Sequence, residues 1–349
     1  MFSFFPYSDL QIKQRHNSKM LYQTYMEALT IYNLRYRYKM IWQKHKDGYQ
    51  LLAKHNLRTD KREYLGRRSE ETEQISSRFK SAKLEIKERL KNLKEKLKRD
   101  EKLNKLEGIA RAPKELVALF RKINELGLDD KLIVIGTNSL YAYEAKAGVA
   151  IEEQHLATRD IDILNRKDKG VSFMFEKLMP SDDAIVLLKS IDKSFYQSET
   201  VPYRFINKDG VWIELITPTA DKVHHNETKQ SFFSDVTPLA MSGMQWLENS
   251  RLFKETVIGE DGKSANITTI HPLEYAIYKN WLGQREDRDF QKHTRDIEQS
   301  RLVTKIILDY MPNIDIEQEI IHLKHIKKEV VLDYVEHIYE PKREKGKEK

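Results

Sequence analysis

Apolar residues recur at three- and four-residue steps through the first part of the chain, which is the pattern of amphipathic helices. After an irregular arm over residues 1–19, this spacing predicts a first helix from Lys19 to about Ala53. A second helix is expected from Ser69 to about Leu106, where a small polar residue followed by acids suits a helix start. Its apolar stripe consists of Ile75, Phe79, Ala82, Ile86, Leu90, Leu93 and Leu97. We expect the two helices to pair as an antiparallel, coiled-coil-like hairpin.

Short apolar runs replace the helical spacing in the middle of the chain. Leu132–Ile135 is expected to be a strand, followed by a turn at Gly136 and a helix-like segment. A second strand is expected at Asp160–Leu164. Residues 201–206 and 211–216 predict two further strands, and the Asp-Gly pair between them is a strong hairpin signal.

Helical spacing returns towards the C-terminus. Residues 219–262 are expected to be loop-rich and to precede a short strand at 267–270. Pro272 suits the first turn of the helix that follows. Two more helices are expected at about 288–310 and 316–338.

These elements predict an α+β protein, in which a mixed sheet flanked by helices follows the long hairpin and precedes C-terminal helices. With 349 residues, the chain is long enough to bury a proper core. We divide it into four parts: a helical, coiled-coil-like region at 1–110, a core at 111–270, a helical region at 271–340 and a charged, disordered tail at 341–349.

Composition narrows the class of protein. Charged residues make up 33% of the chain and the mean hydropathy is −0.67, so long solvated helices are expected. The net charge of +7 favours an anionic partner such as nucleotide or nucleic acid, although a lysine-rich solvated helix gives the same sum. The absence of cysteine excludes disulfides, zinc–thiolate sites and cysteine nucleophiles. Without a membrane-length apolar run or a signal-peptide pattern, a cytoplasmic protein with no membrane contact is expected.

Basic and aromatic residues alternate within the predicted first helix. Arg35 and Arg37 neighbour Tyr36 and Tyr38, and Trp42 follows closely. Such a mixture can hold nucleic acid, through phosphate contacts from the cations and base stacking on the rings. The alternative is an amphipathic helix whose aromatic residues face a core, and this is the interpretation that we favour.

Two acids in the second predicted strand are the first candidates for chemistry. Alternation places Asp160 and Asp162 on one face of the strand, and Ile161 and Ile163 on the other. Two neighbouring carboxylates repel each other, and Mg²⁺ bound between them and substrate phosphates relieves that repulsion. Acids also alternate on ordinary solvent-facing strands, so this motif needs support from elsewhere in the chain.

Glu214 supplies a third acid. It lies within the apolar run VWIELI, where burying an unpaired carboxylate is unfavourable. A metal ion shared with Asp160 and Asp162 is one solution, and a salt bridge to a Lys or Arg is the other. We favour the metal because the three acids occur together.

The turn after the first strand is a candidate phosphate-binding site. Gly136 lets the backbone approach a phosphate closely, and the N–H groups that begin the next helix attract anions. The Thr137 hydroxyl can donate to a phosphate oxygen, and Asn138 completes the turn. An ordinary strand-to-helix turn is the alternative for this motif alone.

Together, Gly136-Thr137, Asp160-Ile161-Asp162 and Glu214 resemble the nucleotidyltransferase superfamily related to DNA polymerase β. Its members carry an apolar strand, a Gly-Ser or Gly-Gly turn, a helix, an Asp-x-Asp strand and a third acid on a later strand. The resemblance implies a polymerase β-like catalytic core at 111–270, in which the three acids bind metal and catalyse. It also implies that Gly136, Thr137 and Asn138 bind the nucleotide. Thr137 replaces the usual Ser, and the connection from it to Asp160 is unusually long.

The fuller string IGTNSLYAYEAKAGV, with ATRDIDIL, resembles a bacterial branch of this superfamily that is named simply nucleotidyltransferase. Downstream, HPLEYAIYKNWL and the following helix resemble the helical segment of abortive-infection-type toxin nucleotidyltransferases. That resemblance implies that Lys279 binds the nucleotide and that Arg288, Asp289 and Asp296 shape the site. Near a triphosphate, Lys279 would stabilise charge that develops on pyrophosphate. The alternative is that Lys279 and Arg288 are surface cations on amphipathic helices.

One hypothesis and one rival follow. The hypothesis is an enzyme that uses Mg²⁺, or Mn²⁺ in its place, to transfer NMP from an NTP such as ATP to an acceptor hydroxyl. RNA, in particular tRNA, or protein is the expected acceptor, with a small molecule as a further option. The rival is a non-catalytic nucleotide- or nucleic-acid-binding protein that engages a partner with its helical hairpin. The sequence does not specify the oligomeric state.

Overall fold

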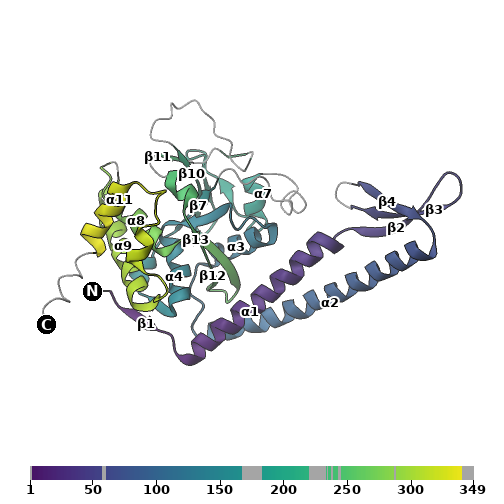
Figure 1. The fold of residues 1–349 in the computed structure, drawn as a ribbon, viewed down its shortest axis with the longest axis horizontal. Helices are drawn as coiled ribbons and strands as arrows, with labels where there is room; N and C mark the ends of the chain where they lie inside the picture. The colour runs from purple at the N-terminus through teal and green to yellow at the C-terminus, as the bar shows by residue number, and fades with distance from the viewer. Residues whose placement is uncertain are drawn as a thin grey trace.

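A long helical hairpin projects from a body of mixed α and β structure, and a small sheet lies at its far end (Figure 1). The computed structural model describes residues 2–56, 60–166, 183–219, 233, 235–236, 239–242, 245–286 and 288–339. The tail expected at 341–349 lies outside the described residues. Within the described ranges, no helix is both long and apolar enough to cross a bilayer.

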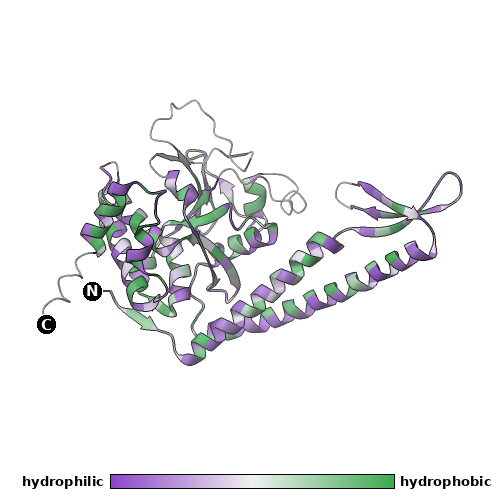
Figure 2. Cartoon of the chain, in the orientation of Figure 1, coloured by the Kyte–Doolittle hydropathy of each residue, from purple (hydrophilic) through white to green (hydrophobic). Residues whose placement is uncertain are grey.

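The hairpin consists of α1 (Asp9–Ile31) and α2 (Glu70–Leu106), which pack against each other as predicted. Ser8 and Ser69 begin these helices, and each hydroxyl accepts a hydrogen bond from the backbone N–H of the third helical residue. Between the helices lies an apolar cluster of Tyr22, Tyr25, Ala28, Ile86, Leu90, Leu93 and Leu97. Elsewhere the two helices are largely hydrophilic, which Figure 2 shows as long purple stretches between short green bands.

The first helix ends much earlier than the spacing predicts. After Ile31 a wider helical turn runs to Tyr36, and the chain then forms a three-stranded antiparallel sheet. We call it the tip sheet; its strands are β2 (Lys39–Lys44), β3 (Gln50–His55) and β4 (Arg62–Arg67). The predicted helix to Ala53 is wrong because Gly48, at φ +87°, turns the chain, and because Ile41 and Trp42 suit a pleated surface.

The expected irregular arm over residues 1–19 is also wrong. Its first part is β1 (Phe4–Pro6), which pairs antiparallel with β6 (Val149–Ile151), and α1 begins at Asp9. The Tyr7 side chain, which is buried, joins Ile109 and Ile258 in a small apolar cluster. The N-terminus is therefore fixed to the body.

Polar contacts fix the base of the hairpin to the body. The Asn104 side chain, fully buried on α2, donates to the Gly262 carbonyl oxygen at 2.9 Å and accepts from Ser18 at 2.8 Å. On α1, the Tyr22 hydroxyl donates to Asn124 at 2.8 Å, and Lys19 forms an ion pair with Glu255 at 2.6 Å. Buried polar groups that satisfy one another in this way hold the hairpin in one orientation.

The body is built on a mixed sheet with the strand order β5-β7-β10-β9-β8, in which β11 also pairs with β10. The strands are β5 (Leu132–Ile135), β7 (Asp160–Asn165), β8 (Tyr196–Gln197), β9 (Arg204–Ile206), β10 (Trp212–Thr219) and β11 (Leu239–Ser242). β7 and β10 are parallel, whereas β5 and β9 run antiparallel to them. The predicted strands at 132–135 and 160–164 and the predicted hairpin β9–β10 are confirmed.

The stretch expected to be loop-rich, 219–262, contains more structure than its composition indicates. Besides β11 it includes a 3₁₀ turn at Gln245–Asn249 and the strand β12 (Leu252–Ile258). β12 pairs antiparallel along its whole length with β13 (Ser264–Ile270), which is longer than the strand expected at 267–270. The two strands form a ribbon between α3 and α4 (Figure 1).

Helices cover the sheet and the ribbon. They are α3 (Lys114–Leu126), α4 (Leu140–Ala147), α5 (Glu153–Leu156), α7 (Ala184–Lys189), α8 (Pro272–Leu282) and α9 (Phe290–Tyr310). The single helix expected at 316–338 is instead split into α10 (Ile316–Ile320) and α11 (Lys328–Tyr334). His325 lies in the break between them and contacts the buried Glu274 carboxylate at 2.9 Å.

Candidate active site

The three predicted acids lie on two neighbouring strands. In the parallel pairing of β7 and β10, Glu214 is directly opposite Asp162, and Trp212 is opposite Asp160. Directly opposed residues of paired strands project from the same face of a sheet, as do alternate residues of one strand. Asp160, Asp162 and Glu214 therefore share a face, while Ile161, Ile163 and Ile213 are buried on the other.

The glycine turn packs directly against this face. β5 brings Ile135 opposite Asp162, and the next residue, Gly136, begins a single 3₁₀ turn (Gly136–Ser139) that leads into α4. Gly136 has φ +72°, and a Cβ atom there would lie 2.5 Å from Asp162 Oδ2. The backbone conformation favours glycine, and any larger residue would displace the Asp162 carboxylate oxygen.

Asn138 joins the turn to the acidic strand. Its Nδ2 donates to the Asp160 carbonyl oxygen at 2.7 Å. Its Oδ1 is buried without a hydrogen-bond partner among the described residues. A buried acceptor in that state is unfavourable unless a ligand or water supplies a donor. The structure therefore places Asn138 beside the acidic strand, and its Oδ1 can accept a hydrogen bond from a ligand or water.

The Asp162 carboxyl lies in an unfavourable environment for a negative charge. Burial, followed by the charges of Asp160 and Glu214, raises its pKa from the ordinary value to about 7. Lys279 and Lys292 act in the opposite direction but do not cancel the effect. A cation beside Asp162 would relieve this excess of negative charge.

The other two acids already have partners. Arg204 Nε donates to Glu214 Oε1 at 2.6 Å, and the Arg204 guanidinium stacks on the Trp212 ring, 4.1 Å from its centroid. The Thr158 hydroxyl donates to an Asp160 carboxylate oxygen. The salt-bridge alternative for Glu214 is therefore the one that the structure contains. Over the described ranges, no three acidic or histidine side chains are gathered closely enough to hold a metal ion together as they stand.

Lys279 lies beneath the site rather than on the surface. Its side chain is buried, and Nζ forms an ion pair with Asp296 Oδ1 at 2.6 Å. Arg288 Nη2 contacts the second oxygen of the same carboxylate at 2.8 Å. Burial lowers the pKa of Lys279, and Asp296 partly offsets this. Asp289 does not join the cluster; it caps α9 by accepting a hydrogen bond from the Gln291 backbone N–H at 2.9 Å.

Two residues absent from the sequence-based set connect α8 and α9 to the glycine turn. Gln299 Nε2 donates to the Thr137 hydroxyl oxygen at 3.0 Å. The Tyr275 hydroxyl lies 3.1 Å from the Gly136 carbonyl oxygen and 3.2 Å from Gln299 Oε1. Because Thr137 accepts from Gln299, its own hydroxyl hydrogen remains for another acceptor. Asp296, Gln299 and Ser300 are three and four residues apart, so they lie on one face of α9, and all three are buried. This spacing of polar residues in the sequence could have indicated Gln299.

Arg204 was also missed, although the predicted hairpin contained it. The predicted four-residue turn at 207–210 would place Arg204 opposite Ile213, whereas the structure pairs Ile206 with Trp212 and therefore Arg204 with Glu214. Opposed residues of an antiparallel pair interact directly. The predicted hairpin was one residue out of register, so it did not identify the partner of Glu214.

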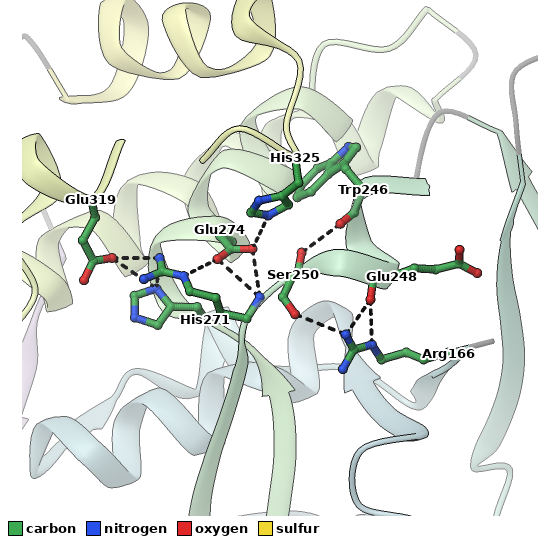
Figure 3. A network of polar contacts seen from close by, with 9 residues as sticks. Arg166, Trp246, Glu248, Ser250, His271, Glu274, Glu319 and His325 are labelled. Atoms are coloured by element: carbon green, nitrogen blue, oxygen red, sulfur yellow. Dashed lines mark hydrogen bonds and ion pairs between the residues drawn. The ribbon is translucent and has the colours of Figure 1, made fainter. Parts of the chain in front are cut away.

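A second polar network fixes α8, the helix that carries Lys279. Glu274, in the first turn of α8 and fully buried, accepts from Arg251 Nε at 2.6 Å and contacts His325 at 2.9 Å (Figure 3). Arg251 also reaches Glu319 at 2.8 Å. Burial and the neighbouring Arg251 lower the pKa of His271. The network holds α10 and the segment between α10 and α11 against the start of α8.

One of three comparisons with known proteins identifies a family for this chain. A family model described as Nucleotidyltransferase matches residues 114–320, which is more than half of the chain. The match contains the glycine turn, the three acids and Lys279, and it leaves out the hairpin and the tip sheet. No curated protein and no solved structure matches the chain. On the strength of the family match, the chain belongs to this nucleotidyltransferase family.

Proposed function

We propose that the protein is an enzyme that transfers NMP from a nucleoside triphosphate to an acceptor hydroxyl and releases pyrophosphate. The observation that carries this proposal is the strand register that places Glu214 opposite Asp162, with Asp160 on the same face. The glycine turn contacts Asp162 itself, so a phosphate held by the turn would lie beside the acids. This core would have a polymerase β-like arrangement, with Asp160, Asp162 and Glu214 as its catalytic residues.

The donor set fits Mg²⁺. Hard oxygen ligands from a few carboxylates, completed by phosphate oxygens, are what Mg²⁺ takes in proteins, and Mn²⁺ accepts the same set. Asp160, Asp162 and Glu214 would hold the ion, which would offset the carboxylate charges that, together with burial, raise the pKa of Asp162. When bound, the ion would supply Lewis-acid stabilisation of the phosphates and of the attacking oxygen.

The protein's own groups would bind and orient the triphosphate. The hydroxyl hydrogen of Thr137 and the N–H groups of the turn Gly136–Ser139 would donate to phosphate oxygens. The buried Oδ1 of Asn138 would accept from a donor on the substrate or on an ordered water. Lys279 would act on the site as a buried positive charge that Asp296 holds in place. Gln299 and Tyr275 would position the turn rather than touch the substrate.

Incubation with each of the four α-labelled NTPs, Mg²⁺ and cell extract tests the proposal. We expect label to enter a macromolecular acceptor, RNA or protein, with the wild type and not with Asp160→Ala/Asp162→Ala. Asp209→Ala, in the exposed β9–β10 turn, is the matched control and should behave as wild type. Equal labelling by the wild type and the double variant would contradict the proposed role of the acids.

A specific observation supports the rival, a non-catalytic nucleotide-binding protein. Glu214 is held by Arg204, which balances its charge without any metal. Calorimetry with ATP, CTP, GTP and UTP separates the two functions. The proposed enzyme binds an NTP more tightly when Mg²⁺ is present, whereas a metal-independent nucleotide sensor binds it equally in both conditions.

A further inference from the structure

Positive charge is concentrated in the part of the chain that the family match leaves out. Residues 1–106 contain 26 Lys and Arg against 13 Asp and Glu, whereas residues 107–349 contain 35 against 41. The body is therefore net acidic, and the hairpin region carries a net charge of +13. Within it, residues 35–68 hold 11 basic and 3 acidic side chains. The net charge of this short segment, +8, is larger than the +7 of the whole protein. Such a separation favours a polyanionic partner for the far end of the hairpin.

This segment forms the tip sheet, which stands well away from the body (Figure 1). α2 connects the two with 37 helical residues, which corresponds to roughly 55 Å of helix. The tip sheet is not free to swing from its own helix, because Tyr38 stacks on Phe79 of α2 with ring centroids 4.8 Å apart. The Thr72 hydroxyl also donates to the Arg67 carbonyl oxygen at 3.0 Å. The tip sheet is thus a surface separate from the body and fixed to the far end of α2.

The strand register sorts the tip sheet into two faces. Leu52 pairs with Trp42 and with Gly66, and this face meets α2, since a Cβ on Gly66 would touch Thr72 at 3.4 Å. The opposite face carries residues that pair across the strands: Lys39, His55 and Arg62; Ile41, Ala53 and Tyr64; Gln43, Leu51 and Arg67. We call this second set the basic face.

Aromatic and guanidinium groups lie together on the basic face. Tyr64 is 51% exposed, and its hydroxyl donates to Gln43, which also accepts from Arg62. Arg67 stacks on the Tyr49 ring, 4.1 Å from its centroid. Gln43 therefore holds the Tyr64 hydroxyl beside Arg62, and Arg67 lies on the same face of β4, an arrangement that suits a base on the ring and phosphates at the guanidinium groups.

Few acids oppose these cations. Asp60 contacts His55 at 2.6 Å and Arg62 at 3.8 Å, and it is strongly exposed. Glu63 belongs to the other face, where it pairs with Lys54 at 3.4 Å. Asp47 lies in the β2–β3 turn beside His45. Over the ranges that the structure describes, Arg67 has no carboxylate within ion-pair distance, so its forked N–H groups suit a phosphate.

We propose that the basic face of the tip sheet binds folded RNA through an unpaired loop or end. A stacking ring needs bases that are not already stacked, and folded RNA presents such bases where duplex DNA buries them. An acidic protein would match the charge but would leave the exposed Tyr64 ring unused. RNA binding by the basic face does not depend on the proposed function. The further step, that the bound RNA is the acceptor of the NMP, rests on the proposed function.

The test measures RNA binding by the full-length protein, without NTP, as the anisotropy of a labelled stem–loop RNA at increasing NaCl. Arg62→Gln/Arg67→Gln removes two cations from the basic face. Lys96→Gln/Lys102→Gln is the matched control, because it removes two exposed cations from α2. Circular dichroism and unfolding temperature verify that all variants fold.

We expect the arginine variant to bind at least about ten-fold more weakly, with a salt dependence reduced by one to two phosphate contacts, while the control changes by less than about two-fold. Tyr64→Ala should weaken the stem–loop by about five-fold or more without altering its salt dependence, as loss of one stacked base predicts. Asp160→Ala/Asp162→Ala should bind RNA as wild type does, so a failure of catalysis leaves this result intact.

Three results would overturn the proposal. The first is equal RNA affinity for wild type and Arg62→Gln/Arg67→Gln. The second is tighter binding of a duplex DNA of matched length than of the stem–loop RNA. The third is equal competition by poly-glutamate, which would assign the face to acidic proteins.

Discussion

Glu214 lies opposite Asp162 across two parallel strands, and its carboxylate is held by Arg204 at 2.6 Å. The side chain that we propose as the third metal ligand is therefore already part of a salt bridge. Arg204 keeps the face stable when no cation is bound, and a cation would compete with it for the Glu214 oxygens. This competition leads to measurable consequences.

Replacing Arg204 should make the protein depend on Mg²⁺ for its stability. In Arg204→Gln, Glu214 keeps its partly buried charge without a partner, which destabilises the fold by about 3 kcal/mol when metal is absent. Added Mg²⁺ should raise the unfolding temperature of Arg204→Gln more than that of the wild type, because it replaces the missing positive charge. Lys208→Gln, on the exposed turn of the same hairpin, is the control. An equal effect of Mg²⁺ on Arg204→Gln and Lys208→Gln would contradict the competition.

Two glycines with nearly the same backbone conformation allow the effect of the contact with Asp162 to be measured apart from the effect of a positive φ. Gly136 and Gly148 have φ of +72° and +69°, but only a Cβ at Gly136 meets Asp162, whereas none of the surroundings of Gly148 lie within 4 Å. Gly136→Ala should therefore destabilise the fold by about 2 kcal/mol more than Gly148→Ala in urea unfolding, and should abolish nucleotidyl transfer. Similar values for the two variants would show that the close packing on Asp162 is unimportant.

The raised pKa of Asp162 makes stability depend on pH in a defined window. The folded protein keeps a proton on Asp162 that the unfolded chain, with its ordinary pKa near 4, has lost. The metal-free protein should therefore lose stability as the pH rises from about 4 to about 7, and no further above that. Asp162→Asn should be more stable than wild type at about pH 8, by a free energy on the order of 2 kcal/mol, and equally stable at about pH 4. A difference that is the same at both pH values would argue against burial of this charge.

The Lys279–Asp296 pair should behave as a buried unit. Lys279→Met leaves the buried Asp296 with Arg288 as its cation and should destabilise the fold by about 3 kcal/mol. Lys279→Met/Asp296→Asn should recover much of that stability, because neither charge remains. If Lys279 also acts on the triphosphate, transfer activity stays low in the double variant even though folding is restored. If the double variant recovers both stability and transfer activity, Lys279 has only a structural role.

Local sequence was sufficient for the elements that position the site. The apolar run Leu132–Ile135, Gly136 and the alternation of Asp160 and Asp162 each determine structure within a few residues, and all are found as predicted. The Asp-Gly turn likewise specified the β9–β10 hairpin.

Contacts between side chains that are far apart in the sequence could not be predicted from local sequence. The contacts of Gln299 with Thr137 and of Lys279 with Asp296 depend on how α8 and α9 pack on the turn, which periodicity does not report. The tip sheet was missed for a different reason. Its alternating aromatic and basic residues also fit a helical period, and only the turn at Gly48 decides between the two.

The proposed chemistry is measured most simply as the transfer of α-phosphate label from an NTP, in the presence of Mg²⁺, by wild type, Asp162→Asn and Asp209→Asn. Asp162→Asn keeps the shape of the side chain and removes its charge, and by its pKa it should fold at least as well as wild type. We predict that label transfer falls by at least about 100-fold in Asp162→Asn and is unchanged in Asp209→Asn. Transfer by Asp162→Asn at the wild-type rate would contradict a catalytic site built on the acids of β7 and β10.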